Sequence, residues 1–218
     1  MASYSVHMAF AKMLNEELHM EEDSLMMGSV AADICYYDGE PKSIAHFETG
    51  FKKADSKRFL EKYQGELNNP FVMGYLSHLY LDEHFYDDFL KQYYDLKEGH
   101  SYTDQNAIFI DKNTKKIIPF NEIYSPEGIY GDYQKIDPNV YFKYNLKKEY
   151  NIDNIVNIIE EIDNKKIGFI NYEINRFPAK LIKEPTKCFE YEDLQAFLKE
   201  YAKKFIRQRK LYRSWKLS

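Results

Sequence analysis

Apolar residues recur at the spacing of an α-helix over much of the chain. Such a stripe runs through residues 5–18, returns at residues 152–162 and repeats at residues 194–205. Residues three and four apart lie on one face of a helix, so each stripe predicts a helix with one buried side. The first stripe contains His7 among alanine and leucine residues, which predicts a histidine that points inward.

Capping signals place two further helices between these stripes. Asp55 can accept hydrogen bonds from the first turn of a short helix that ends near Tyr63. Asn69 followed by Pro70 is a typical N-cap with a proline at the first helical position. The helix that these two residues begin is expected to run to about Tyr93.

The remaining segments favour turns and one small sheet. Gly28 predicts a loop that carries residues 29–35. Two short β-type runs, residues 108–110 and 117–118, flank a polar turn and predict a β-hairpin. Residues 119–145 contain three prolines and two glycines and are expected to be rich in loops. We therefore expect a mainly α fold, a multi-helical single domain comprising the whole chain, with a small β-hairpin insertion.

The composition is that of a globular protein, with 44% apolar and 30% charged residues. The net charge of −5 argues against nucleic acid as the main partner, because binding a phosphate backbone requires a broad basic face. Cys35 and Cys188 form no paired cysteine motif. The sequence shows neither a signal peptide nor a run that could span a bilayer, so we expect a cytoplasmic protein.

The charge pattern changes beyond Glu200, where seven basic residues follow and no acidic one. Basic residues near the end of a helix complement its dipole, so a solvated helix end is the simpler interpretation. A weak contact between this basic C-terminus and an anionic membrane surface is the alternative.

The long helix predicted to begin after Asn69 carries the strongest chemical signal. Its otherwise aromatic stripe is interrupted by His78 and Asp82, which are four residues apart and therefore point the same way. An ionised carboxylate is costly to bury without a partner, so the two residues either pair with each other or face a cation. A histidine and an aspartate one turn apart are common ligands of a transition metal.

Three more residues of metal-ligand type lie in apolar surroundings. Asp33 follows the apolar residues 30–32, His46 lies in another apolar run, and His7 shares its helical face with apolar residues only. A single buried histidine is more often a hydrogen-bonded core residue than a ligand. Together with His78 and Asp82, however, these residues could supply imidazole and carboxylate ligands for one or two zinc ions.

The order of these residues along the chain is itself informative. His7 is followed by Gly28–Ile34, by His46–Phe47 and by Gly74–Asp82. This order resembles the zinc-dependent phospholipase C family, which is related to single-strand-specific zinc nucleases, and the resemblance covers residues 5–90. It implies an all-helical fold of the zinc-dependent phospholipase C type, with a cluster of up to three zinc ions.

The resemblance further implies which residues would hold which ion. The ligands of a first ion would be Asp33, His46, His78 and Asp82. Those of a second ion would be His7 and a shared Asp82, with the amino terminus as a further ligand in secreted members. The candidates for a third ion are His84, Asp88, His100 and Asp104.

The expected reaction is hydrolysis of a phosphodiester or phosphomonoester by metal-bound hydroxide, because such ions lower the pKa of water towards neutrality and polarise a phosphoryl oxygen. By the same resemblance, Asp33 would orient or deprotonate that water. The substrate would be a small phosphoester or a lipid headgroup.

Three other interpretations compete with a hydrolase of this type. In one, a single structural zinc ties the first helix to the long one, and an open coordination position beside a pocket would separate the two cases. In another, the protein is an aromatic-rich interaction module whose histidines only pack. The helical phosphohydrolases marked by a His-Asp dipeptide are disfavoured, because the chain contains no such dipeptide.

Overall fold

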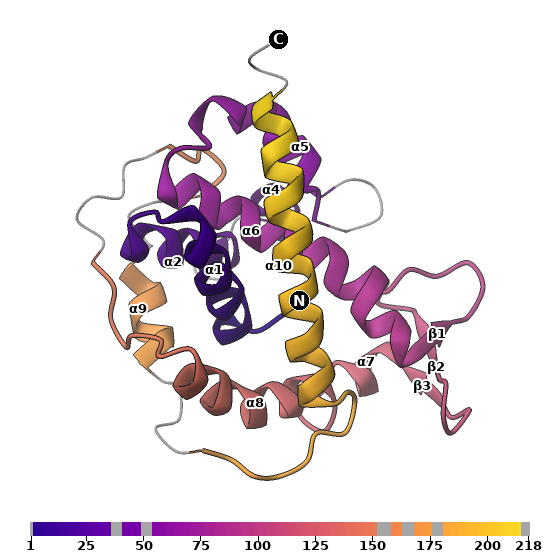
Figure 1. The fold of residues 1–218 in the computed structure, drawn as a ribbon. Helices are drawn as coiled ribbons and strands as arrows, with labels where there is room; N and C mark the ends of the chain where they lie inside the picture. The colour runs from indigo at the N-terminus through magenta and orange to yellow at the C-terminus, as the bar shows by residue number, and fades with distance from the viewer. Residues whose placement is uncertain are drawn as a thin grey trace.

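Helices make up most of the structure, a computed structural model, and a three-stranded antiparallel sheet lies at one side (Figure 1). The mainly α prediction with a small β insertion is therefore confirmed. No helix in the described part of the chain is long and apolar enough to cross a bilayer. The structure describes residues 2–35, 41–48, 54–151, 158–162, 168–175 and 181–214.

The first two helices are joined by a short turn. α1 spans Tyr4–Leu18, as its apolar stripe predicted, and ends at His19 in a left-handed conformation with φ +50°. α2 spans Glu22–Ala31, and its N-cap Glu21 accepts hydrogen bonds from two backbone N–H groups of the first turn. The loop predicted around Gly28 is therefore wrong, because Gly28 lies in the interior of α2.

Close approach of two helix backbones explains this glycine. A Cβ atom at Gly28 would lie 2.1 Å from the carbonyl oxygen of Phe71, which belongs to α6 (Pro70–His84). In the same way, a Cβ atom at Gly74 of α6 would lie 2.1 Å from the carbonyl oxygen of Leu25 in α2. The missing side chains let α2 and α6 pack almost backbone to backbone, which no larger residue would permit.

Capping residues begin two of the next three helices as predicted, whereas α4 (Lys42–Ala45) was not predicted. α5 spans Ser56–Tyr63 with Asp55 as its cap. Asn69 caps α6 by accepting hydrogen bonds from two backbone N–H groups of its first turn. All residues of α6 from Phe71 to Asp82 are buried, so this helix runs through the centre of the protein.

The helix predicted to reach Tyr93 ends earlier. α6 stops at His84, and the chain continues as a π-helical turn over Phe85–Phe89 and a 3-10 turn over Leu90–Gln92. The wider turn keeps the rings of both Phe85 and Phe89 buried, with centroids 6.5 and 5.2 Å from that of Phe189. The prediction of one uninterrupted α-helix was therefore wrong over its last two turns.

The small sheet has the strand order β1-β2-β3, with both pairs antiparallel. β2 (Ile108–Asp111) and β3 (Ile117–Pro119) form the predicted hairpin, in which Phe109 lies opposite Ile118. β1 (Tyr94–Leu96) was not predicted, because three residues are too few to show an alternating pattern.

The segment expected to be rich in loops contains two helices, α7 (Phe120–Ile123) and α8 (Ile129–Lys143). The prediction of loops over residues 119–145 was therefore wrong. Pro138 lies inside α8, where a proline removes one backbone hydrogen bond. The burial of one apolar face of α8 outweighs that local cost, since Ile129, Tyr133, Ile136 and Val140 are all buried.

The C-terminal part holds α9 (Gly168–Asn175) and the long α10 (Tyr191–Ser214). The predicted helix over residues 152–162 falls largely outside the described residues, and residues 158–162 are not helical, although Ile159 and Ile162 are buried. The stripe at residues 194–205 forms the buried face of α10, as predicted. α10 lies across α1 and α6 (Figure 1).

Candidate metal centre

Five predicted metal ligands converge beside α6. His78 and Asp82 lie one turn apart on α6, His7 comes from α1, and His46 is the residue that follows α4. Asp33 lies in a 3-10 turn that directly continues α2. Each of the five residues is at most 3% exposed.

The rings of His46 and His78 lie next to each other, and each lies near the carboxylates of Asp33 and Asp82. The Nε2 atoms of His46 and His78 are 3.2 Å apart. The Nε2 atom of His46 lies 3.3 Å from Asp33 Oδ1 and 3.7 Å from Asp82 Oδ2, and the corresponding distances from His78 are 3.9 and 3.6 Å. Donors bound tetrahedrally to zinc at about 2.0–2.1 Å stand roughly 3.3–3.4 Å apart. The observed distances bracket this value, so each histidine lies at a distance from both carboxylates that suits shared binding of a metal ion.

Backbone contacts orient the two imidazole rings. His78 Nδ1 lies 2.9 Å from the carbonyl oxygen of Ser29, and His46 Nδ1 lies 3.1 Å from that of Lys42. A carbonyl oxygen only accepts hydrogen bonds, so each Nδ1 donates, and in its neutral form each ring then presents a bare lone pair at Nε2. Two lone pairs at 3.2 Å repel each other unless a cation or a proton lies between them. Such backbone contacts are typical of histidines that bind metal.

The ionisation of the cluster suits metal binding. Burial and the neighbouring His7 lower the pKa of His78 to about 3, so that this ring is neutral at pH 7. Burial alone would raise the pKa of the Asp33 carboxyl, but His78 and His46 outweigh it and hold that pKa below its usual range. The pKa of Asp82 is likewise held low against burial, chiefly by His7. Neutral imidazoles and ionised carboxylates are the forms that bind a metal.

His7 lies on the other side of Asp82. Its Nε2 atom is 3.3 Å from Asp82 Oδ1, and its ring stacks on that of His78 with centroids 3.8 Å apart. The backbone N–H of Ala2 donates to the same Asp82 oxygen at 3.3 Å. Asp82 therefore turns one oxygen towards His46 and His78 and the other towards His7.

Several polar atoms of the centre lack a hydrogen-bond partner among the described residues. They are both ring nitrogens of His7 and the Oδ1 atom of Asp33, all of which are buried. A buried polar atom without a partner is costly. A bound cation would satisfy these atoms, and groups of three potential ligands that could hold one are formed by His7, Asp33 and His78 and by His46, His78 and Asp82.

The candidates for a third ion lie outside this centre. His84 Nδ1 pairs with Asp88 Oδ2 at 2.6 Å, and His100 Nδ1 pairs with Asp104 Oδ2 at 2.9 Å. Both pairs are partly exposed. Within the described ranges, neither pair belongs to a group of three potential ligands. The structure thus joins five of the nine predicted residues and leaves the other four as two separate pairs.

A group of tyrosines near the carboxylates was missed by the sequence analysis. Burial, with the charge of Asp82 contributing, raises the pKa of three tyrosine hydroxyls, those of Tyr86, Tyr124 and Tyr133. Burial and the charge of Asp33 also raise the pKa of Tyr130, which is nevertheless 46% exposed. Tyr86 lies four residues after Asp82, so the helical spacing that relates Asp82 to His78 could have identified it, whereas no local pattern related the other three tyrosines to the histidines.

Asp137 of α8 anchors the first turn of α1. The hydroxyls of Ser3 and Ser5 donate hydrogen bonds to Asp137 Oδ1 at 2.5 and 2.6 Å. Burial raises the pKa of Asp137 to about 6, although these two donors act in the opposite direction. Because the backbone N–H of His7 donates to the Ser3 carbonyl, the anchor also helps to place His7 at the centre.

Comparison with protein-family models, curated proteins and solved structures found no match to the chain. The family suggested by the order of the ligands is therefore a proposal. The described residues themselves establish a mainly α protein with a buried cluster of three histidines and two aspartates that could hold a metal ion.

Proposed function

We propose that this protein is a zinc-dependent phosphoester hydrolase of the zinc-dependent phospholipase C type. The observation that carries the proposal is the position of Asp82, whose two carboxylate oxygens face different ligands. A closed structural site uses four ligands for one ion, and the cluster already offers four without His7. A fifth ligand beside a carboxylate that can bridge is typical of hydrolytic sites with two ions.

Three residues of the centre have distinct roles in the proposed hydrolysis. Bound zinc supplies a Lewis acid that makes water nucleophilic near neutral pH and polarises a phosphoryl oxygen. His46 and His78 would hold it with rings whose orientation is set by backbone carbonyls. Asp33 would be a further ligand, and its carboxylate can also accept a hydrogen bond from the attacking water and orient it.

Tyr130 is a further residue that could contact a substrate. It is 46% exposed, and its hydroxyl is close enough to Asp33 for that charge to raise its pKa. A tyrosine with a raised pKa stays protonated at neutral pH and can donate a hydrogen bond to a phosphoryl oxygen. The substrate that we propose is a small phosphoester, a class that includes lipid headgroups.

The burial of the ligands favours a second candidate function. All five are at most 3% exposed, as in a structural site that is closed to substrate. In that case one zinc ion would tie the turn that follows α2 and the end of α4 to α6 and contribute to folding without catalysis.

Metal analysis combined with an activity assay separates the two candidates. Protein purified without chelator is analysed for metal content and tested on p-nitrophenyl phosphate and bis(p-nitrophenyl) phosphate. The hydrolase proposal predicts that His7→Ala lowers the metal content and abolishes hydrolysis while the protein stays folded. A structural zinc predicts one ion per chain, no hydrolysis by the wild type, and unchanged metal content in His7→Ala. Wild-type protein that contains no metal refutes both.

A further inference from the structure

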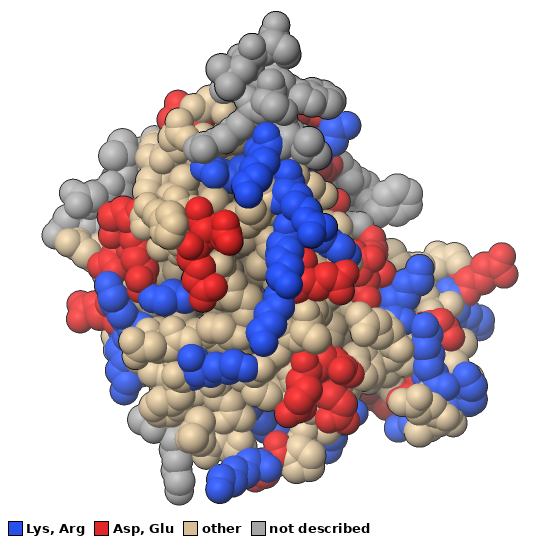
Figure 2. All heavy atoms as spheres, in the orientation of Figure 1, with Lys and Arg blue, Asp and Glu red and all other residues tan. Residues whose placement is uncertain are grey.

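One face of α10 carries a row of basic side chains. Lys199, Lys203, Arg207 and Lys210 follow one another at intervals of four, four and three residues, so they share one side of the helix. All four residues are exposed, and Figure 2 shows basic side chains forming a column along α10. At about 1.5 Å per residue, the row is roughly 16 Å long.

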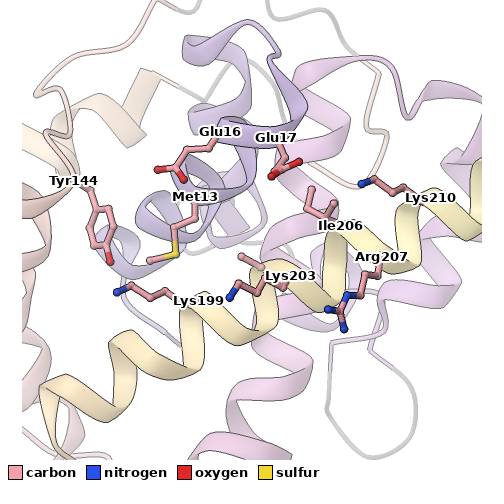
Figure 3. Close-up of a pocket in the computed structure, with 10 residues that line it drawn as sticks. Met13, Glu16, Glu17, Tyr144, Lys199, Lys203, Ile206, Arg207 and Lys210 are labelled. Carbon is pink, nitrogen blue, oxygen red and sulfur yellow. The ribbon is translucent and has the colours of Figure 1, made fainter.

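The row forms one wall of a groove of about 400 Å³ between α10 and the C-terminal end of α1 (Figure 3). Glu16 and Glu17 of α1 line the groove on the opposite side. Apolar side chains contribute to the lining between the two walls, and Tyr144 lies at one end. The Tyr144 hydroxyl is buried and has no hydrogen-bond partner in the described part of the chain.

The basic side chains of the row differ from their neighbour Lys204 in their ion pairing. Among the described residues, none of the four basic side chains forms an ion pair, whereas Glu200 and Lys204 on the same helix pair at 2.7 Å. Like charges one turn apart destabilise a helix. Glu16 and Glu17 lie across the groove, but among the described residues they form no ion pair with the row. The charge of the row is therefore available to an anionic partner.

We infer that this groove binds an acidic linear segment of a partner protein. Successive basic residues four apart stand about 6 Å from each other along the helix. An extended peptide places alternate side chains on one side at roughly 6.6 Å intervals, so alternating acidic residues would meet successive basic ones. Glu16 and Glu17 would repel acidic residues on the other side of the segment, which gives the bound peptide a defined orientation.

A membrane surface fits this region less well. The basic residues line a concave groove, and acidic side chains flank the row on both sides in Figure 2. A flat anionic bilayer would therefore meet both signs of charge at once. None of the large exposed apolar side chains lies within residues 191–210 of α10, so this part of the helix lacks residues that would insert into lipid.

Two variants of the full chain with the same change in charge provide the test. Lys203→Glu/Arg207→Glu reverses the middle of the row. Lys97→Glu/Lys116→Glu reverses two exposed lysines beside the small sheet. Each pair lowers the net charge by four, two units at each of two positions. The probe is a fluorescent peptide of about eight residues in which Glu and Ala alternate, and its glutamine counterpart is the uncharged control.

Fluorescence anisotropy should show that the wild type binds the acidic peptide and not the glutamine peptide. The row variant should bind at least about tenfold more weakly, and the sheet variant should stay within about twofold of the wild type. Raising the salt from about 50 mM to about 500 mM should weaken binding, because these charges are exposed. Circular dichroism checks that both variants fold, and Lys203→Gln/Arg207→Gln replaces the row variant if it does not.

Three results would overturn the inference. The first is a wild type that does not bind the acidic peptide, and the second is an equal loss of binding in the two variants. The third is sedimentation of the wild type with phosphatidylserine vesicles, lost in the row variant, in the absence of peptide binding. That last result would assign the row to a membrane surface instead. None of these outcomes depends on the metal centre.

Discussion

Chelation of the metal should destabilise the wild-type protein and leave a His78→Ala variant unaffected. Without a cation, the Nε2 lone pairs of His46 and His78 face each other at 3.2 Å in the interior. The carboxylates of Asp33 and Asp82 lie within 3.9 Å of these nitrogens and add negative charge to the same space. A bound cation would relieve both conflicts, so its binding energy would contribute to folding.

The size of the effect follows from mass action. A ligand present at about 100 times its dissociation constant stabilises the folded state by about 2.7 kcal/mol. In a chain of about this size, each kcal/mol shifts the Tm by about 2–4 °C, so chelation should lower the wild-type Tm by about 5–11 °C. His78→Ala removes a ligand and leaves a cavity, which lowers the Tm before any chelator is added. Chelator should then move its Tm by no more than about 1 °C.

Thermal unfolding with and without EDTA, together with metal analysis, measures these differences. His19→Asn is the matched control, because His19 is exposed and lies outside the cluster at a left-handed position that asparagine tolerates. This variant should keep both its metal and its response to EDTA. The reasoning is refuted if EDTA strips metal from the wild type without lowering the Tm, or if His78→Ala retains the wild-type metal content.

Further predictions concern packing, pH and activity. Gly28→Ala should destabilise the protein by about 3 kcal/mol or more in urea unfolding, because its Cβ would lie 2.1 Å from the Phe71 carbonyl oxygen. The control Gly65→Ala should be nearly neutral, because a Cβ at Gly65 would meet open space. The raised pKa of Asp137 means that its contribution to stability is complete below about pH 4 and is lost as the pH rises through about 6. The free energy of unfolding of Asp137→Asn should therefore rise by roughly 1–2 kcal/mol relative to that of the wild type between pH 4.5 and pH 7.5. An equal difference between the two proteins at both pH values would contradict the raised pKa of Asp137. Tyr130→Phe should lower phosphoester hydrolysis by about tenfold or more at unchanged metal content, and unchanged hydrolysis would remove Tyr130 from the proposed substrate contacts.

Local spacing and capping chemistry were sufficient to predict the elements that depend on near neighbours. Asp55 and Asn69 begin α5 and α6 because their side chains accept hydrogen bonds from the first turn, which is a property of adjacent residues. His78 and Asp82 were expected to point the same way because four residues make about one helical turn, and the structure places Nε2 and Oδ2 3.6 Å apart. The hairpin of β2 and β3 was likewise visible as two apolar runs around a polar turn.

Tertiary packing decided the features that depend on residues distant in the sequence. Gly28 looked like a loop residue, and only the approach of the α6 backbone shows why a glycine occupies the interior of a helix. Tyr124, Tyr130 and Tyr133 could not be related to Asp33 and Asp82, because they come from later segments, whereas Tyr86 lies only four residues after Asp82. The sequence determines the direction of a side chain within its own helix, whereas the distance between side chains on different helices is determined by how the helices pack.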